Sequence, residues 1–138
     1  MPDKGELEMR FAKVVYLVAG IYGLAVIVPM YFLKVKIGRD LPPAITHPEY
    51  FYGFVGVALA WQILFLVLAR DPLRYRPMMI PAIVEKLSYG IALVILHLQH
   101  RLPLIVFQVG SVDWLFAVLF AAAYIATRRD PWKRHTTA

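Results

Sequence analysis

VVYLVAGIYGLAVIVPMYFL, residues 14–33, contains no charged side chain, and neither does YFYGFVGVALAWQILFLVLA, residues 50–69. About 20 helical residues, at 1.5 Å each, are enough to cross the roughly 30 Å hydrocarbon core of a bilayer. We therefore predict that both stretches are transmembrane helices.

Two further apolar segments follow, although each of them carries charge. Residues 78–98 contain Glu85 and Lys86, and residues 102–127 contain Asp113. Placing a charge inside a span raises the free energy of membrane insertion by a few kcal/mol. Each apolar neighbour lowers it by roughly 0.3 to 0.6 kcal/mol, so several of them together offset one charge. A protein with two spans and a soluble tail would instead leave IALVILHL and WLFAVLFAAAYIA in water.

The fold class that we predict is all-α: an integral membrane bundle of four transmembrane helices in a single domain. The expected helices are residues 11–33, 50–69, 78–100 and 102–127. Residues 1–10 and 128–138 are expected to form polar cytoplasmic tails. The composition agrees with this class, because 60% of the 138 residues are hydrophobic, 17% are charged and the mean hydropathy is +0.61, whereas soluble domains carry about 25% charged residues.

The net charge of +6 is explained by the predicted topology. Ten basic residues fall on the side that holds both termini, and four fall on the other side. The positive-inside rule then places both termini in the cytoplasm of a multi-pass protein of the cell membrane. Anionic lipid headgroups attract the basic excess, so we predict no nucleic-acid partner. The ten are Lys4, Arg10, Lys13, Arg70, Arg74, Arg76, Arg128, Arg129, Lys133 and Arg134, and the four are Lys34, Lys36, Arg39 and Arg101.

The chain has no cysteine, which excludes disulfides, thiolate nucleophiles and iron–sulfur clusters. The histidines offer a weak metal site: His97 and His100 lie near the outer end of the third helix, and His47 lies in the first outer loop. Three imidazoles on one face could bind a metal, but an interfacial role is favoured. We predict neither a bound metal nor another cofactor.

Polar residues gather at one depth of the predicted bundle. By helical rise, Gln62, Glu85, Lys86 and Asp113 fall within about one turn of one another on three helices. Adjacent residues on a helix diverge by about 100°, so Glu85 and Lys86 are predicted not to point at each other.

This polar set has a structural and a functional interpretation. In the first, Lys86 and Asp113 form an interhelical ion pair that fixes helix packing. Glu85 then hydrogen-bonds one of three polar neighbours, Gln62, Ser88 or Tyr89. In the second, an incompletely paired Glu85 or Asp113 binds a proton, a cation or the polar head of a lipophilic ligand. A third possibility places Glu85 at an oligomer seam. The aromatic residues Trp61 and Trp114 lie at similar depth and complete the candidate set.

The long first outer loop contains LPP, residues 41–43, and leads into the aromatic helix start YFY, residues 50–52. With four short helices and short later loops, this arrangement resembles the DoxX-like small membrane proteins over most of the chain. The resemblance implies a small accessory membrane subunit, some members being linked to quinone-dependent oxidation of small sulfur compounds. It implies no site residue.

Three functions are compatible with these features. The chain shows no catalytic motif, which favours a non-enzymatic accessory or binding subunit with a protein partner or a second copy. The second is an enzyme or binding protein for a lipophilic substrate such as a quinone, isoprenoid or sterol-like molecule. A proton-coupled transporter acting as an oligomer is the third.

Overall fold

The structure is a computed structural model that describes residue 1 and residues 3–128. The rest of the predicted polar tail 128–138, with Arg129, Lys133 and Arg134, lies outside the described residues. All regular secondary structure in the described part is helical, and the helices are α1 Lys4–Asp40, α2 Pro48–Arg70, η1 Arg76–Met78, α3 Met79–Leu98, α4 Leu104–Gly110 and α5 Val112–Ala126.

Four helical segments are long and apolar enough to cross a membrane. They are α1, α2, the η1–α3 segment Arg76–Leu98 and the α4–α5 segment Leu104–Ala126. The prediction of an all-α protein with four helices of spanning length is therefore confirmed.

The first helix is longer than the predicted range of residues 11–33. It has 37 residues, which correspond to about 55 Å of helix. Asp3 caps its start by accepting a hydrogen bond from the Lys4 backbone N–H. Ion pairs between residues four apart, Glu6 with Arg10 and Lys36 with Asp40, support its two ends. Most of the predicted tail 1–10 is therefore helical, and the first outer connection is short.

The third helix ends before the predicted residue 100. The α-helix stops at Leu98, and His100 has a φ of 55°. The Arg101 N–H then donates to the Leu96 carbonyl over 3.0 Å, which is the six-to-one hydrogen bond of a Schellman termination. The left-handed residue at this position terminates α3 two residues early.

The fourth predicted helix, residues 102–127, is interrupted at Ser111. The Ser111 hydroxyl donates to the Phe107 carbonyl over 2.7 Å, and such a bond to the preceding turn bends a helix. The segment is therefore divided into α4 and α5, two residues before Asp113.

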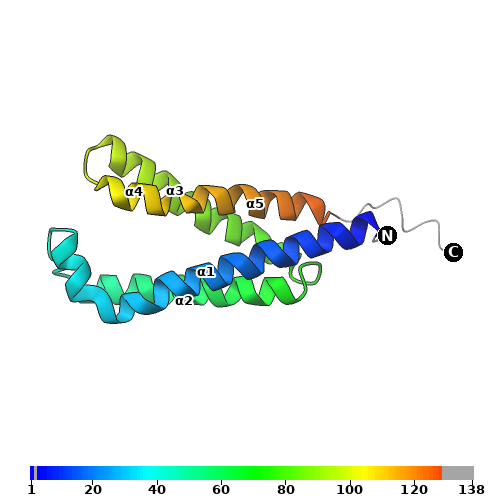
Figure 1. Ribbon diagram of the computed structural model, residues 1–138, viewed down its shortest axis with the longest axis horizontal. Coiled ribbons are helices and arrows are strands. Elements are labelled where there is room, and N and C mark those ends of the chain that lie inside the picture. The colour runs from blue at the N-terminus through cyan, green and yellow to red at the C-terminus, as the bar shows by residue number, and fades with distance from the viewer. Residues whose placement is uncertain (2, 129–138) are drawn as a thin grey trace.

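The helices form two antiparallel hairpins (Figure 1). One consists of α1 packed along α2, and the other consists of α3 packed along α4 and α5; α1 also contacts α5. The N-terminus, the α2–η1 loop and the end of α5 lie together at one end, and the hairpins diverge toward the other end (Figure 1).

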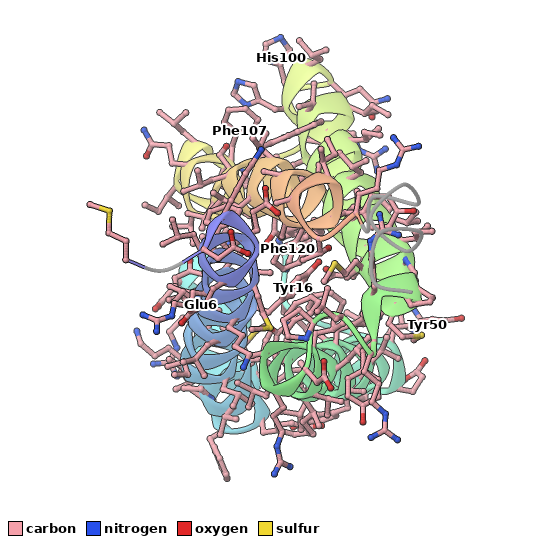
Figure 2. The ribbon with its side chains drawn as sticks, turned by 90° about the vertical axis from the view of Figure 1, so that its right-hand side faces the viewer. Glu6, Tyr16, Tyr50, His100, Phe107 and Phe120 are labelled. Carbon is pink, nitrogen blue, oxygen red and sulfur yellow. The ribbon has the colours of Figure 1, made fainter. Side chains whose placement is uncertain are left out.

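An aromatic core joins the hairpins at the end that holds the N-terminus. The ring of Tyr16 on α1 stacks on Phe120 of α5 with centroids 4.4 Å apart, and Phe65 of α2 meets Phe120 edge-on at 5.0 Å. Figure 2, viewed from this end, shows Tyr16 and Phe120 in the middle of the molecule. All three side chains are fully buried, so this end of the bundle is closed.

The outer surface of the bundle is apolar. Only 17% of the most apolar window of the α4–α5 segment is buried inside the protein. Valine, leucine and isoleucine side chains of α1 also face outward; examples are Val14, Leu17, Val18 and Ile21. Soluble monomers rarely expose continuous apolar surface of this extent.

Candidate ligand-binding cavity

A cavity of about 630 Å³ lies between the two hairpins, next to the aromatic core. Residues of all five α-helices line it. Its walls are mainly apolar, with Ile27 and Met30 on α1, Val57 on α2 and Val84 on α3. Small-molecule sites commonly enclose roughly 300–1,000 Å³ between apolar walls with a few placed polar groups, and this cavity has that size and character.

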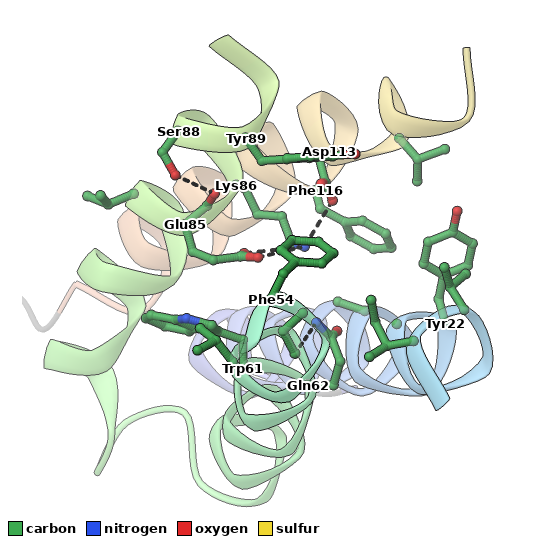
Figure 3. Close-up of a pocket in the computed structure, with 18 of the residues that line it drawn as sticks. Tyr22, Phe54, Trp61, Gln62, Glu85, Lys86, Ser88, Tyr89, Asp113 and Phe116 are labelled. Carbon is green, nitrogen blue, oxygen red and sulfur yellow. Dashed lines mark hydrogen bonds and ion pairs between the residues drawn. The ribbon is translucent and has the colours of Figure 1, made fainter. Parts of the chain in front are cut away.

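The charged groups that line the cavity are Glu85, Lys86 and Asp113, which we call the ion cluster. Lys86 Nζ lies 2.9 Å from Asp113 Oδ1, and this contact joins α3 to α5. The same nitrogen lies 3.3 Å from Glu85 Oε2 and makes a long hydrogen bond of 3.5 Å to Oε1. Figure 3 shows the Lys86 ammonium between the two carboxylates. The predicted interhelical ion pair is present.

The prediction that Glu85 and Lys86 would not point at each other is wrong. Their Cα–Cβ bonds do diverge around the helix, but the long lysine stem curls so that its ammonium reaches both acids. A flexible four-carbon stem allows this, since the charged head of a lysine is not confined to the direction of its Cβ.

One oxygen of the Glu85 carboxylate has no hydrogen bond among the described residues. This oxygen, Oε2, is close enough to Lys86 for Coulombic attraction, but within the described residues no donor meets hydrogen-bond geometry at this buried atom. None of the three neighbours predicted to bind the carboxylate does so: Ser88 donates to the Glu85 backbone carbonyl over 2.9 Å instead. One carboxylate oxygen therefore has unused hydrogen-bonding capacity inside the protein.

The ion cluster is partly shielded from the surroundings. The exposed fractions of the side chains are 8% for Lys86, 16% for Asp113 and 19% for Glu85. The Phe65 ring centroid lies 5.3 Å from Lys86 Nζ, within reach of a cation–π interaction. The aromatic core thus forms one side of the cluster, and the cavity forms another.

Gln62 shares the cavity but not the ion cluster. Its Nε2 donates to the Ala58 carbonyl of its own helix over 3.0 Å. Its Oε1 packs against Gly23, where an added Cβ would lie only 1.8 Å away. Figure 3 shows the Gln62 amide bonded within α2 rather than to the cluster. The Gln62 amide therefore packs at the α1–α2 contact, apart from the ion cluster.

The other predicted site residues separate into two groups. Trp61, Ser88 and Tyr89 line the cavity together with the ion cluster. Trp114 does not; its indole packs against Gly90 at the α3–α5 contact, where a Cβ would meet Trp114 Cε2 at 2.8 Å. Trp114 therefore packs α3 against α5, although its depth in the bundle is similar to that of the cavity residues.

The histidines have local contacts in the structure. His97 stacks on Phe107 of α4 with ring centroids 4.2 Å apart. His47 contacts Glu49 over 3.1 Å and lies beside Tyr50. Residue 1 and residues 3–128 contain no group of three His, Asp or Glu side chains that could hold a metal ion.

Sequence reasoning missed two structural contributions. Arg76, placed in a loop, donates from Nη2 to the Tyr124 carbonyl over 2.9 Å and lies 3.9 Å over the Tyr124 ring, so it ties η1 to α5. The sequence did not distinguish Phe65 from the many other apolar residues, although the centroid of its ring lies 5.3 Å from Lys86 Nζ. Spacing alone offered a signal for Phe65, since it lies on the α2 face three residues after Gln62.

Comparisons of this chain with family models, curated proteins and solved structures find no match. The resemblance to DoxX-like proteins stays a prediction.

Proposed function

We propose that this protein is a four-span integral membrane protein that binds a lipophilic small molecule in the cavity between its hairpins. The observation that carries the proposal is the cavity itself: about 630 Å³ with apolar walls, and with Glu85, Lys86 and Asp113 at one side. The ligand tail occupies the apolar part, and its polar head meets the ion cluster.

The outer surface supports membrane insertion. Four helices have spanning length and composition, and many large apolar side chains point away from the bundle. In lipid such a surface is solvated, whereas in water it is a cause of aggregation.

The distribution of basic residues supports an orientation with both termini in the cytoplasm of the cell membrane. The end that holds the N-terminus, the α2–η1 loop and the end of α5 carries the larger group of basic residues in the sequence. Such an excess is retained on the cytoplasmic side during insertion.

The rim of the cavity supports entry of a ligand from the membrane. Val57 on α2 is 61% exposed and Val84 on α3 is 57% exposed, and both line the cavity. An apolar rim on the lipid-facing surface lets a hydrophobic molecule enter sideways without crossing water. A quinone, an isoprenoid or a sterol-like molecule fits this chemistry.

The test is mass spectrometry of the small molecules that co-purify with the intact protein in lipid nanodiscs. We expect a lipophilic compound that is retained by the wild type and lost from Val57→Trp, whose indole would obstruct the rim of the cavity. Val118→Trp is the matched control, because Val118 is exposed on α5 and does not line the cavity. Equal amounts of every co-purifying compound in the two variants would rule out binding in this cavity.

An accessory subunit with a protein partner and an oligomeric proton-coupled transporter stay predictions. Each of these two functions requires another protein chain. The cavity gives no reason to prefer either of them to the binding of a small molecule.

A further inference from the structure

We propose that the cavity selects a ligand whose polar head donates hydrogen bonds, such as a hydroxyl or a protonated amine, over one that only accepts them. This inference rests on the proposed function and adds the chemistry of the head. It follows from which hydrogen-bonding groups of the ion cluster are already used and which are left.

The strongest donor in the cavity is already occupied. A lysine ammonium has three N–H donors and no acceptor. Around Lys86 Nζ stand Asp113 Oδ1 at 2.9 Å, Glu85 at 3.3 to 3.5 Å and the Phe65 ring at 5.3 Å. Two carboxylates and an aromatic ring therefore already surround the ammonium. A carboxylate or phosphate head would have to displace one of these partners to reach the ammonium.

Acceptors, in contrast, are in surplus. With all three groups ionised, two carboxylates and one ammonium leave the ion cluster with one net negative charge. Glu85 Oε2 is buried and, among the described residues, receives no hydrogen bond. That oxygen itself is too enclosed for a ligand to reach, but two carboxylates offer about eight lone-pair sites to the three N–H groups of one ammonium, so the partly exposed side chains of Glu85 and Asp113 retain acceptor capacity for a donor on the ligand. An anionic head would add charge of the same sign instead.

The neighbouring polar side chains do not reverse this preference. The Gln62 amide N–H bonds Ala58, and the Ser88 hydroxyl bonds the Glu85 backbone carbonyl. Trp61 and Tyr89 also line the cavity and carry neutral donors. Hydrogen bonds to an ionised acceptor are roughly twice as strong as bonds between neutral groups, so the two carboxylates that line the cavity, Glu85 and Asp113, determine the selectivity.

The experiment compares four amphiphiles with the same chain length and different heads. Hexadecanol and hexadecylamine donate hydrogen bonds, methyl palmitate only accepts them, and palmitate is an anion. Each is titrated into the purified full-length protein in one detergent, and binding is followed by isothermal titration calorimetry. We expect the apparent Kd of a donating head to be at least about tenfold lower than that of methyl palmitate, as a hydrogen bond to a charged group implies.

The outcomes separate the inference from the proposed function. Tight binding by the amine alone assigns the preference to charge compensation, and binding by alcohol and amine assigns it to hydrogen-bond donation; both support the inference. Equal affinities for all four heads, or a preference for palmitate or methyl palmitate, would overturn it and leave the cavity as a lipophilic site. If none of the four bound, the proposed function itself would fail.

Glu85→Gln gives a second readout. The amide replaces an acceptor-only group by one that also donates. We therefore expect the Kd of methyl palmitate divided by the Kd of hexadecanol to fall toward one. Glu49→Gln is the matched control, because Glu49 is exposed at the start of α2, outside the cavity, and the ratio should not change. The comparison of heads on the wild type does not depend on how well either variant folds.

Discussion

The Lys86 side chain connects α3 to α5 through an ion pair with Asp113. Its ammonium lies between the carboxylates of its neighbour Glu85 and of Asp113 on another helix. Ion pairs of this kind offset a large desolvation cost, and removing one member leaves the others uncompensated. The pair with Asp113 therefore holds α3 against α5, and the longer contact with Glu85 leaves the buried Oε2 atom of Glu85 without a hydrogen bond among the described residues.

Substituting Lys86→Met tests this arrangement. We expect the free energy of unfolding in detergent micelles to fall by about 3 to 5 kcal/mol, because two acids then face each other without a cation. Adding Asp113→Asn in the same chain should restore part of the loss, since it removes one of the two charges.

The control for this experiment is Lys36→Met. Lys36 pairs with Asp40 at the exposed end of α1, where both side chains are about half exposed or more. Exposed pairs contribute roughly 0.2 to 1 kcal/mol. If Lys86→Met were no more destabilising than Lys36→Met, the ion cluster would have no structural role.

Among the helices, α1 and α2 make the closest contact. Gly20 and Gly23 of α1 face α2: an added Cβ would approach Leu66 to 2.7 Å from Gly20 and Gln62 to 1.8 Å from Gly23. Small residues let helix backbones approach closely. Gly90 and Gly110 have the same role in the second hairpin, against Trp114 and Leu93. Each hairpin is thus a tightly packed unit, which leaves free space between the hairpins rather than within them.

Gly23→Ala should therefore destabilise the first hairpin. The methyl group would force Gln62 out of its position and break its hydrogen bond to Ala58. We expect a loss of about 1 to 3 kcal/mol in the free energy of unfolding, as is typical of overpacking. Thermal unfolding in nanodiscs measures the effect.

Gly53→Ala is the matched control on α2, since nothing lies within 4 Å of a Cβ there. Alanine is a better helix former than glycine by about 1 kcal/mol, so this change should be neutral or stabilising. Gln62→Ala in the Gly23→Ala background should recover stability. A Gly23→Ala protein as stable as Gly53→Ala would show that the α1–α2 contact is looser than described.

The whole molecule is a wedge of two hairpins, closed by aromatic packing at one end and diverging toward the other (Figure 1). The ion cluster lies where the closed core gives way to the cavity. Arg76 holds the two parts of the second hairpin together at the closed end, through its contacts with Tyr124. This shape opens the cavity toward the apolar outer surface while the ion cluster stays mostly buried.

The proposed orientation is open to a direct experiment, because the chain has no native cysteine. In Thr46→Cys the thiol lies in the exposed α1–α2 connection, and in Gly5→Cys it lies near the exposed start of α1. We expect a membrane-impermeant maleimide to label the first variant in intact cells. The second should react only after the membrane is permeabilised. Labelling of Gly5→Cys in intact cells, with protection of Thr46→Cys, would reverse the proposed topology.

Much of this architecture follows from the amino-acid sequence, and the rest depends on long-range contacts. Apolar runs such as residues 14–33 and 50–69 predict helices of spanning length, since helical rise and hydrocarbon thickness are general quantities. Helical rise also placed Glu85, Lys86 and Asp113 at one depth, where they do meet. Helix ends were less predictable: α1 extends through residues 4–10, and Ser111 breaks the last segment, because local capping and side-chain bonds determine these points.

Apart from the ion pair of Lys86 with Asp113, which helical depth predicted, no pattern along the chain could specify how the polar side chains divide among partners. Lys86 reaches both acids because its stem is flexible, Gln62 turns to its own helix because Gly23 leaves room for it, and Trp114 packs on Gly90. Each outcome depends on the distance between two helices, and that distance is a property of the packed molecule. The cavity has the same origin, since it is the space left where two well-packed hairpins diverge.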